Sequence, residues 1–225
     1  IIMQVTGSKI VIESLIAENV DTVFGYPGGA IMNVYDELHK QNQITHILNR
    51  HEQACVLSAN GYARVSGKVG VAIVTSGPGF TNALTGIADA YMDSIPIVII
   101  SGQVPLNLIG TDGFQEIDAV GISRPCTKHN FLVKDVKDLA RIMKEAFYIA
   151  RSGRPGPVLV DIPKDVSIHH TKFEYPDTIN IPTYNPITKG DINKIKELAS
   201  AISHAKRPIF YIGGGSVRAN ASDLI

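Results

Sequence analysis

Residues 47–65, ILNRHEQACVLSANGYARV, decide how the rest of the chain is read. A short apolar run at residues 44–48 stops at Arg50-His51-Glu52, and small residues then recur along residues 54–63. This pattern predicts a strand that turns directly into a helix lying close against a sheet. The Glu52 carboxylate would sit at the helix N-terminus, where the helix dipole favours negative charge. Because first-turn acids are common in helices, Glu52 alone indicates no function.

Strands and helices alternate along most of the chain. Nearly continuous apolar runs at residues 69–75 and 95–101 are typical of strands that are covered on both faces. Further strands are expected at residues 20–24, 131–133 and 158–162, and helices at residues 6–18, 30–40, 81–92 and 138–151. Residues 102–123 lack periodicity and predict a long loop with a helical piece. The order predicts an α/β fold with a doubly wound, mainly parallel sheet and helices on both faces.

The composition changes after residue 165. Pro176, Pro182 and Pro186 lie among polar residues, which indicates an interdomain linker at residues 166–189. Beyond it, we expect a helix at residues 191–204 and a strand at residues 208–212. Since a domain usually needs at least about 50 residues, residues 190–225 would be only the incomplete start of a second, central α/β domain. Residues 1–165 would form the N-terminal domain, and the chain would be a fragment of a longer protein.

The composition argues against several classes of function. Lys+Arg and Asp+Glu both number 21, so no net field attracts nucleic acid or an anionic membrane. The longest apolar run, residues 97–100, is too short to span a bilayer. Cys55 and Cys126 have no CxxC spacing, which predicts buried thiols in a reducing, cytoplasmic compartment. The adjacent His169 and His170 point apart on a regular element, and we assign no metal site.

Glycine-rich and polar loops follow four of the predicted strands. They are residues 25–29, 49–52, 76–79 and 102–115, and in a parallel sheet they would meet at the edge where ligands bind. Gly77-Pro78-Gly79 opens a helix and could cradle a phosphate. However, the spacing is not GxGxxG, because Asn82 stands where the third glycine would be needed. A tight turn is the ordinary interpretation of this tripeptide.

Eight short motifs follow one another along the chain. They are Tyr26-Pro27-Gly28-Gly29, Arg50-His51-Glu52, Thr75-Ser76-Gly77-Pro78-Gly79, Ser101-Gly102-Gln103-Val104-Pro105, Gly110-Thr111-Asp112, Phe114-Gln115-Glu116, Arg154-Pro155-Gly156-Pro157-Val158 and Asp161-Ile162-Pro163-Lys164-Asp165. Together they resemble the N-terminal, pyrimidine-binding domain of thiamine diphosphate enzymes, and most closely the catalytic (large) subunit of the acetolactate (acetohydroxyacid) synthase family. The resemblance extends over essentially the whole chain.

The resemblance implies a role for each candidate residue. In that family a glutamate at the position of Glu52 hydrogen-bonds N1′ of the cofactor's aminopyrimidine and so helps to deprotonate thiazolium C2. The implied catalytic residues are Glu52 and Gln115. The residues implied to contact the cofactor are Tyr26, Pro27, Gly28, Glu52, Thr75, Pro78 and Asn82, with Arg154 contacting FAD in flavin-containing members. The implied substrate-facing residues are Gly29, Ala30, Phe114, Gln115 and Lys164.

Two of these assignments have an ordinary structural alternative. Lys164 lies close in sequence to Asp161 and Asp165 and could be a solvated cation. Arg154 could hydrogen-bond the turn at the end of its own helix.

Cofactors and partners are also implied by the resemblance. Thiamine diphosphate would bind with Mg²⁺, whose ligands lie outside these residues, and FAD is an option in the full-length protein. The full-length protein would be a homodimer or tetramer with its active site at the subunit interface, and a small regulatory subunit could join it. The implied reaction decarboxylates pyruvate and joins it to pyruvate or 2-ketobutyrate, giving 2-acetolactate or 2-aceto-2-hydroxybutyrate for branched-chain amino acid biosynthesis. The fragment alone is expected to be inactive.

Two alternatives remain open at this point. One is a sibling enzyme on the same scaffold, such as pyruvate oxidase or sulfoacetaldehyde acetyltransferase. The other is a non-catalytic α/β nucleotide-binding module, which would share the sheet and the glycine turns but would not need Glu52.

Overall fold

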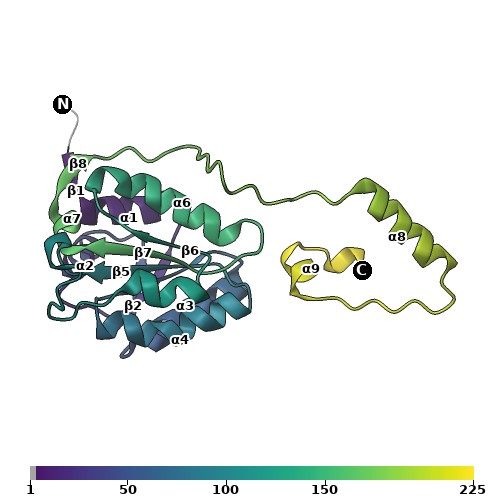
Figure 1. Ribbon diagram of the computed structural model, residues 1–225, viewed down its shortest axis with the longest axis horizontal. Helices are drawn as coiled ribbons and strands as arrows, with labels where there is room; N and C mark the ends of the chain where they lie inside the picture. The colour runs from purple at the N-terminus through teal and green to yellow at the C-terminus, as the bar shows by residue number, and fades with distance from the viewer. Residues whose placement is uncertain (1–3) are drawn as a thin grey trace. The chain divides into compact units, whose positions relative to one another are not determined.

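A six-stranded parallel sheet forms the centre of the first part of the chain (Figure 1). The computed structural model describes residues 4–225 and divides the chain into two compact units, Ile1–Ile181 and Pro182–Ile225. The sheet lies in the first unit, with the strand order β3-β2-β4-β5-β7-β6 and every pairing parallel. The strands are β2 (Thr22–Gly25), β3 (Thr45–Leu48), β4 (Gly70–Val74), β5 (Ile97–Gln103), β6 (His129–Leu132) and β7 (Val158–Pro163). The predicted parallel α/β fold is therefore confirmed.

The continuous apolar runs in the sequence are the central strands of this sheet. Every residue of β4, β5 and β7 is buried. Helices cover both faces, with α1 and α6 on one side and α3 and α4 on the other (Figure 1). The helices of this unit are α1 (Gly7–Ala17), α2 (Met32–His39), α3 (Glu52–Ser66), α4 (Pro78–Met92), α5 (Ala119–Ser123), α6 (Leu139–Arg151) and α7 (Lys164–Ile168).

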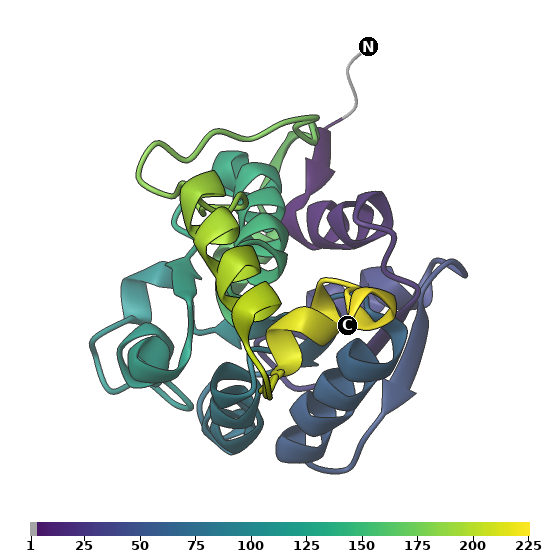
Figure 2. The ribbon, with the colours of Figure 1, turned by 90° about the vertical axis from the view of Figure 1, so that its right-hand side faces the viewer.

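Helices α3 and α4 lie side by side and pack closely (Figure 2). Their shared core contains the buried side chains of Cys55, Val56, Phe80 and Ile87. Gly86 of α4 sits so near α3 that a Cβ there would lie 2.8 Å from Val56. The small residues that indicated a closely packed helix therefore let two helices approach each other as well as the sheet. This packing fixes the relative position of the two helix N-termini.

Local interactions explain why α3 begins and ends where it does. At its start, the Nδ1 atom of the His51 side chain accepts a hydrogen bond from the backbone N–H of Gln53 at 3.2 Å. At its end, Gly67 adopts φ +71°, a left-handed conformation that favours glycine and stops a helix. Helix α4 begins at Pro78, three residues before the predicted start, because proline is well suited to the first turn of a helix.

A second, two-stranded antiparallel sheet joins distant parts of the chain. Strand β1 (Gln4–Thr6) pairs with β8 (His170–Lys172), and the sequence indicated neither strand. Strand β8 lies in the range predicted to be a linker, so the first residues of that range are structured. The predicted boundaries at residues 165 and 189 stay predictions, while the division into compact units falls between residues 181 and 182.

The second unit is helical among its described residues. It contains α8 (Ile192–His204), α9 (Gly214–Arg218) and the short 3₁₀ helix η4 (Ser222–Leu224). The Asp191 side chain caps α8 by accepting from the backbone N–H groups of Asn193 and Lys194. The strand expected at residues 208–212 is wrong, since this segment has no strand partner and leaves Ile209 93% exposed. A single extended segment lacks the ladder hydrogen bonds that would make it a strand.

Within residues 4–225, no helix combines the length and apolarity needed to cross a membrane. Both cysteines are free thiols: Cys55 is buried and Cys126 half-buried.

Candidate cofactor site

The parallel strands bring the predicted loops to one edge of the sheet. Strands β2, β3, β4 and β5 end at Gly25, Leu48, Val74 and Gln103, and their neighbours in the sheet run in the same direction. The carboxyl ends of parallel strands lie at a common edge, where open α/β sheets bind ligands. The turn before α2, the N-terminus of α3, the N-terminus of α4 and the loop after β5 therefore lie at this edge.

Glu52 is a buried acid at this edge. It is the first residue of α3, and only 8% of it is exposed. The Nδ2 amide of Asn82, in the second turn of α4, donates a 3.0 Å hydrogen bond to Glu52 Oε2. The other oxygen, Oε1, points toward Gly79, since a Cβ there would lie 3.3 Å from it. Asn82 therefore holds one carboxylate oxygen, and the structure records no hydrogen bond to Oε1 within the described residues.

Two glycines enclose Thr75 next to Glu52. A Cβ on Gly28 would lie 2.5 Å from the Thr75 Cβ, and a Cβ on Gly79 would lie 2.6 Å from Thr75 Cγ2. Both turns therefore approach Thr75 more closely than any larger residue allows. The Thr75 Oγ1 atom is buried and has no hydrogen-bond partner among the described residues. Buried hydroxyl groups are normally hydrogen-bonded, so this atom marks a position where a ligand can supply a partner.

The loop of residues 104–117, called the Gln115 loop below, folds back on the N-terminal turn of α4. Gly77 adopts φ +57°, and a Cβ on it would lie 2.7–2.9 Å from the backbone of Gln115. Gln115 itself adopts φ +57°. Its neighbour Phe114 is 89% exposed. The structure thus places the predicted residues Phe114 and Gln115 at the same edge as Glu52.

The other predicted contact residues lie at this edge, with one exception. Tyr26, Pro27 and Gly29 are exposed in the turn after β2, and Pro78 is exposed in the first turn of α4. The backbone of Ala30 packs against Gly102 so closely that a Cβ on Gly102 would lie 2.8 Å from the Ala30 carbonyl carbon. Lys164 is exposed directly after β7, as the first residue of α7.

Arg154 is the exception, because it lies before the amino end of β7. Its Nε atom donates to Ser94 Oγ at 2.7 Å, and Nη2 donates to the backbone carbonyls of Tyr91 and Met92 at 3.5 and 3.4 Å. Tyr91 and Met92 are the last residues of α4, and Ser94 follows the helix. Helix α4 starts at the Glu52 edge of the sheet and runs to the opposite edge. The arginine therefore caps the end of α4 instead of its own turn and does not join the Glu52 cluster.

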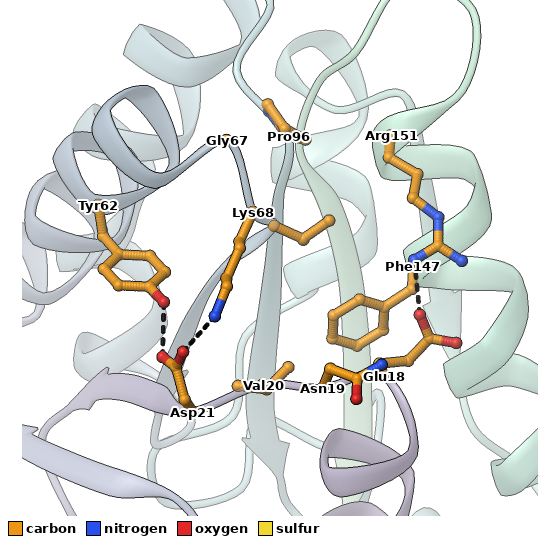
Figure 3. Close-up of a pocket in the computed structure, with 11 residues that line it drawn as sticks. Glu18, Asn19, Val20, Asp21, Tyr62, Gly67, Lys68, Pro96, Phe147 and Arg151 are labelled. Carbon is orange, nitrogen blue, oxygen red and sulfur yellow. Dashed lines mark hydrogen bonds and ion pairs between the residues drawn. The ribbon is translucent and has the colours of Figure 1, made fainter.

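A cavity of about 210 Å³ also opens at this opposite edge (Figure 3). Its acidic side chains are already paired. Asp21 accepts a hydrogen bond from Tyr62 at 2.5 Å and pairs with Lys68, and Glu18 pairs with Arg151 at 2.7 Å. The hydrogen bond from Lys68, followed by that from Tyr62, lowers the pKa of Asp21 to about 2. The charged side chains that line this cavity are therefore paired with one another and do not need a ligand to balance their charge. The Glu52 edge is the better candidate site.

The sequence interpretation missed a buried polar cluster beneath the Gln115 loop. Ser101, Gln103 and Asp161 are each at most 2% exposed and lie on the central strands β5 and β7. Burial raises the pKa of Asp161 to about 7. The signal that could have found this cluster is the presence of polar residues in otherwise apolar strands. Within residues 4–225, no group of three or more His, Cys, Asp or Glu residues could hold a metal ion.

A model of a known protein family matches the first half of the chain. The sequence profile described as "Thiamine pyrophosphate enzyme, N-terminal TPP binding domain" matches residues 5–122. This range includes the buried acid, the two glycine turns and the Gln115 loop. Thiamine pyrophosphate (TPP) is another name for thiamine diphosphate.

Similar curated proteins extend the match over nearly the whole chain. The acetolactate synthase large subunit of Haemophilus influenzae is 53% identical over 99% of this chain. The acetolactate synthase isozyme 3 large subunit of Escherichia coli is 53% identical over 95% of it, and an acetolactate synthase of Mycobacterium leprae is 51% identical over 99%. The chain spans only 39%, 38% and 36% of the length of these relatives. The profile match and the cofactor edge agree: the chain belongs to the thiamine pyrophosphate enzyme family and contains its N-terminal TPP-binding domain.

Proposed function

We propose that the full-length protein is the catalytic (large) subunit of an acetolactate synthase. It would be a thiamine diphosphate-dependent transferase that decarboxylates pyruvate and joins the remaining two-carbon unit to a second 2-keto acid. The single observation that carries this proposal is the buried Glu52 carboxylate at the N-terminus of α3, held by Asn82 on α4. The relatives that are 51–53% identical to the chain over the aligned residues are named as acetolactate synthases, which supports this substrate class.

The residues at the Glu52 edge fit the aminopyrimidine half of the cofactor. Glu52 offers an oxygen for a ring nitrogen, and the buried Thr75 hydroxyl offers a second polar contact. Gly28 and Gly79 add no side-chain atoms of their own, so both turns lie directly against Thr75. The described residues provide no comparable set of acids for Mg²⁺ and a diphosphate group. We therefore propose that the ligands of Mg²⁺ lie outside this chain.

When bound, thiamine diphosphate would supply a nucleophilic carbon for addition to the 2-keto group and a cationic ring that takes up the electron pair of the C–C bond broken as CO2 leaves. Glu52 would share a proton with N1′ of the aminopyrimidine, a role that requires a carboxyl group. Asn82 would keep the carboxylate in place. Phe114 and Gln115 would cover the reacting edge, and the Lys164 ammonium would attract the carboxylate of the 2-keto acid.

The similarity to acetolactate synthases supports proposals for further features of the full-length protein. We propose a homodimer or tetramer with the active site between subunits, and a small regulatory subunit as partner of this large subunit. We propose FAD as a further cofactor, contacted by Arg154 at the edge opposite Glu52. We also propose a cytoplasmic location and a role in branched-chain amino acid biosynthesis, with pyruvate and 2-ketobutyrate as acceptors.

One assay tests the reaction. The full-length protein is incubated in aerated phosphate buffer with pyruvate, thiamine diphosphate, Mg²⁺ and FAD, and acetolactate is measured beside acetate and acetyl phosphate. We expect acetolactate as the main product, and 2-aceto-2-hydroxybutyrate when 2-ketobutyrate is added. Acetyl phosphate would instead favour a pyruvate oxidase, and no binding of thiamine diphosphate would favour a non-catalytic module. The assay is repeated with Glu52→Gln, which should lose most of the activity, and with Glu13→Gln as the matched control, because Glu13 pairs with Lys9 on the surface of α1.

A further inference from the structure

The buried polar cluster beneath the Gln115 loop has no role in the chemistry proposed above. Ser101 and Gln103 point from β5 toward β7, where the register pairs Ser101 with Asp161. Asp161 is only 1% exposed, and Ser101 and Gln103 are buried as well. Burying a carboxyl group is costly unless hydrogen bonds compensate for the lost water. A cluster of this kind therefore needs a structural or functional reason.

Both ends of the Gln103 side-chain amide form hydrogen bonds in this cluster. Its Nε2 atom donates to Asp161 Oδ2 at 3.0 Å and to the backbone carbonyl of Ile117 at 2.8 Å. Its Oε1 atom accepts from the backbone N–H of Val104 at 2.9 Å. Val104 and Ile117 are the first and last residues of the Gln115 loop. One buried side chain thus joins both ends of the loop.

Asp161 fixes the orientation of that amide. The Ser101 hydroxyl is hydrogen-bonded to Asp161 Oδ1, which leaves Oδ2 for Gln103. Oδ2 acts as the acceptor of this hydrogen bond, so the NH2 end of the amide must face it. The reversed orientation would bring Oε1 against both Asp161 and the Ile117 carbonyl. The amide therefore has one favourable orientation, and this orientation connects the ends of the loop.

The rest of the loop is braced by two further carboxylates. Asp165 accepts from the backbone N–H of Leu106 at 3.2 Å. Glu116 accepts from the backbone N–H groups of Thr111 and Gly113 at 3.2 Å each, and from that of Gly110. Because the loop is internally tied, a displacement at its base is transmitted to Gln115.

We propose that Gln103, oriented by Asp161, is a positioning residue for the Gln115 loop. It sets how the two ends of the loop meet and thereby places Gln115 on the Gly77 turn beside Glu52. Gln103 does not touch the reacting atoms and acts only through the loop. The effect on turnover rests on the proposed function, whereas the effect on loop order does not.

Amide hydrogen exchange in the full-length protein tests the effect of Gln103 on loop order separately from its effect on turnover. Gln103→Met keeps the length of the side chain but removes its hydrogen bonds. We expect amides in residues 104–117 to exchange about tenfold faster, because local opening becomes easier, with little change in α3 and α4. The matched control is Gln41→Met: Gln41 also bonds backbone groups, at Leu38 and Ile44, but in the loop before β3. It should leave residues 104–117 unchanged.

Two variants of Asp161 and a kinetic measurement complete the test. Asp161→Asn should keep loop protection, since its oxygen can accept from Gln103 and its NH2 can donate to Ser101, whereas Asp161→Leu should lose it. Gln103→Met should lower kcat about tenfold without weakening thiamine diphosphate binding. Unchanged exchange in Gln103→Met, or an equally large increase in α3 and α4, overturns the proposal. If the wild-type protein makes no acetolactate, the proposed function fails while the exchange data still decide the positioning role.

Discussion

The amide of Asn82 donates a 3.0 Å hydrogen bond to the carboxylate of Glu52 across the contact between α3 and α4. The two residues stand at the N-terminal ends of helices that are separated in sequence by the whole of β4. The close packing of these helices brings the two side chains together. The hydrogen bond therefore links the position of the acid to the position of α4 and the glycine turn that precedes it.

Removal of this hydrogen bond should weaken the cofactor site. Hydrogen bonds to charged groups contribute about 1.5–3 kcal/mol, so Asn82→Ala should lower the affinity for thiamine diphosphate by about tenfold or more. Isothermal titration of the full-length protein measures this change. Asn193→Ala on the exposed helix α8 provides the control and should bind as the wild type does. Equal affinity of Asn82→Ala and wild type would show that the Asn82 contact does not matter for binding.

Loss of the carboxyl group itself should slow catalysis and spare binding. Glu52→Gln can still accept the hydrogen bond from Asn82, so the fold and the affinity for thiamine diphosphate should change little. General acid–base assistance contributes about 10²–10⁴-fold, and turnover should fall within this range. Deuterium exchange at C2 of the bound cofactor reports the assisted proton transfer directly. An exchange rate equal to that of the wild type would remove Glu52 from the mechanism.

The sequence predicted the sheet well because its signals are local. Continuous apolar runs correspond to the buried strands β4, β5 and β7, and the loops that follow the strands meet at one edge because parallel strands require it. The pairing of β1 with β8 was not predicted, because three-residue strands carry almost no pattern of their own. The segment at residues 208–212 has a strand-like sequence, but a strand also needs a neighbour, and local sequence does not supply one.

The site was predicted unevenly for the same reason. Glu52, Thr75 and Gln115 lie in short motifs, and their arrival at one edge follows from the topology. The contacts of Arg154 with Ser94 and the end of α4 depend on packing across 60 residues of sequence, which local patterns do not reveal. The link between Gln103 and Asp161 is equally remote in sequence.

The glycine cradle around Thr75 predicts a specific rescue. Gly79→Ala should destabilise the protein by about 1–3 kcal/mol through overpacking, because its Cβ would lie 2.6 Å from Thr75 Cγ2. Thr75→Ser removes that methyl group, so the double variant should recover most of the loss. Urea unfolding of wild type, single and double variants measures the effect. Additive losses in the double variant would contradict the predicted contact.

Gly28→Ala provides the comparison for Gly79→Ala, because Thr75→Ser should not rescue it. A Cβ there would meet Thr75 Cβ at 2.5 Å and Oγ1 at 2.7 Å, atoms that serine retains. Gly28→Ala should therefore stay destabilised when combined with Thr75→Ser. Gly61→Ala is the control, since nothing lies within 4 Å of a Cβ on this exposed α3 residue. It should be neutral or stabilise by up to about 1 kcal/mol, as alanine is a better helix former than glycine.

Buried Asp161 should make stability fall as the pH rises. Burial raises its pKa from the ordinary 3.8 to about 7, more than the hydrogen bonds from Ser101 and Gln103 lower it. Between these two pH values the folded state binds more protons than the unfolded state, so each rise in pH lowers the free energy of unfolding. The stability contributed by protonated Asp161 is complete below about pH 4 and lost above about pH 7.

The Asp161→Asn variant isolates this contribution. Its stability relative to wild type should increase steadily from pH 4 to pH 7 and then level off. Burial lowers the pKa of His46 and His129, which gives the opposite slope near pH 6, but both proteins contain these histidines and the difference cancels them. Urea unfolding of the two proteins at one-unit pH intervals measures the difference. A constant offset over the whole range would mean that Asp161 is ionised throughout and that burial does not control its proton.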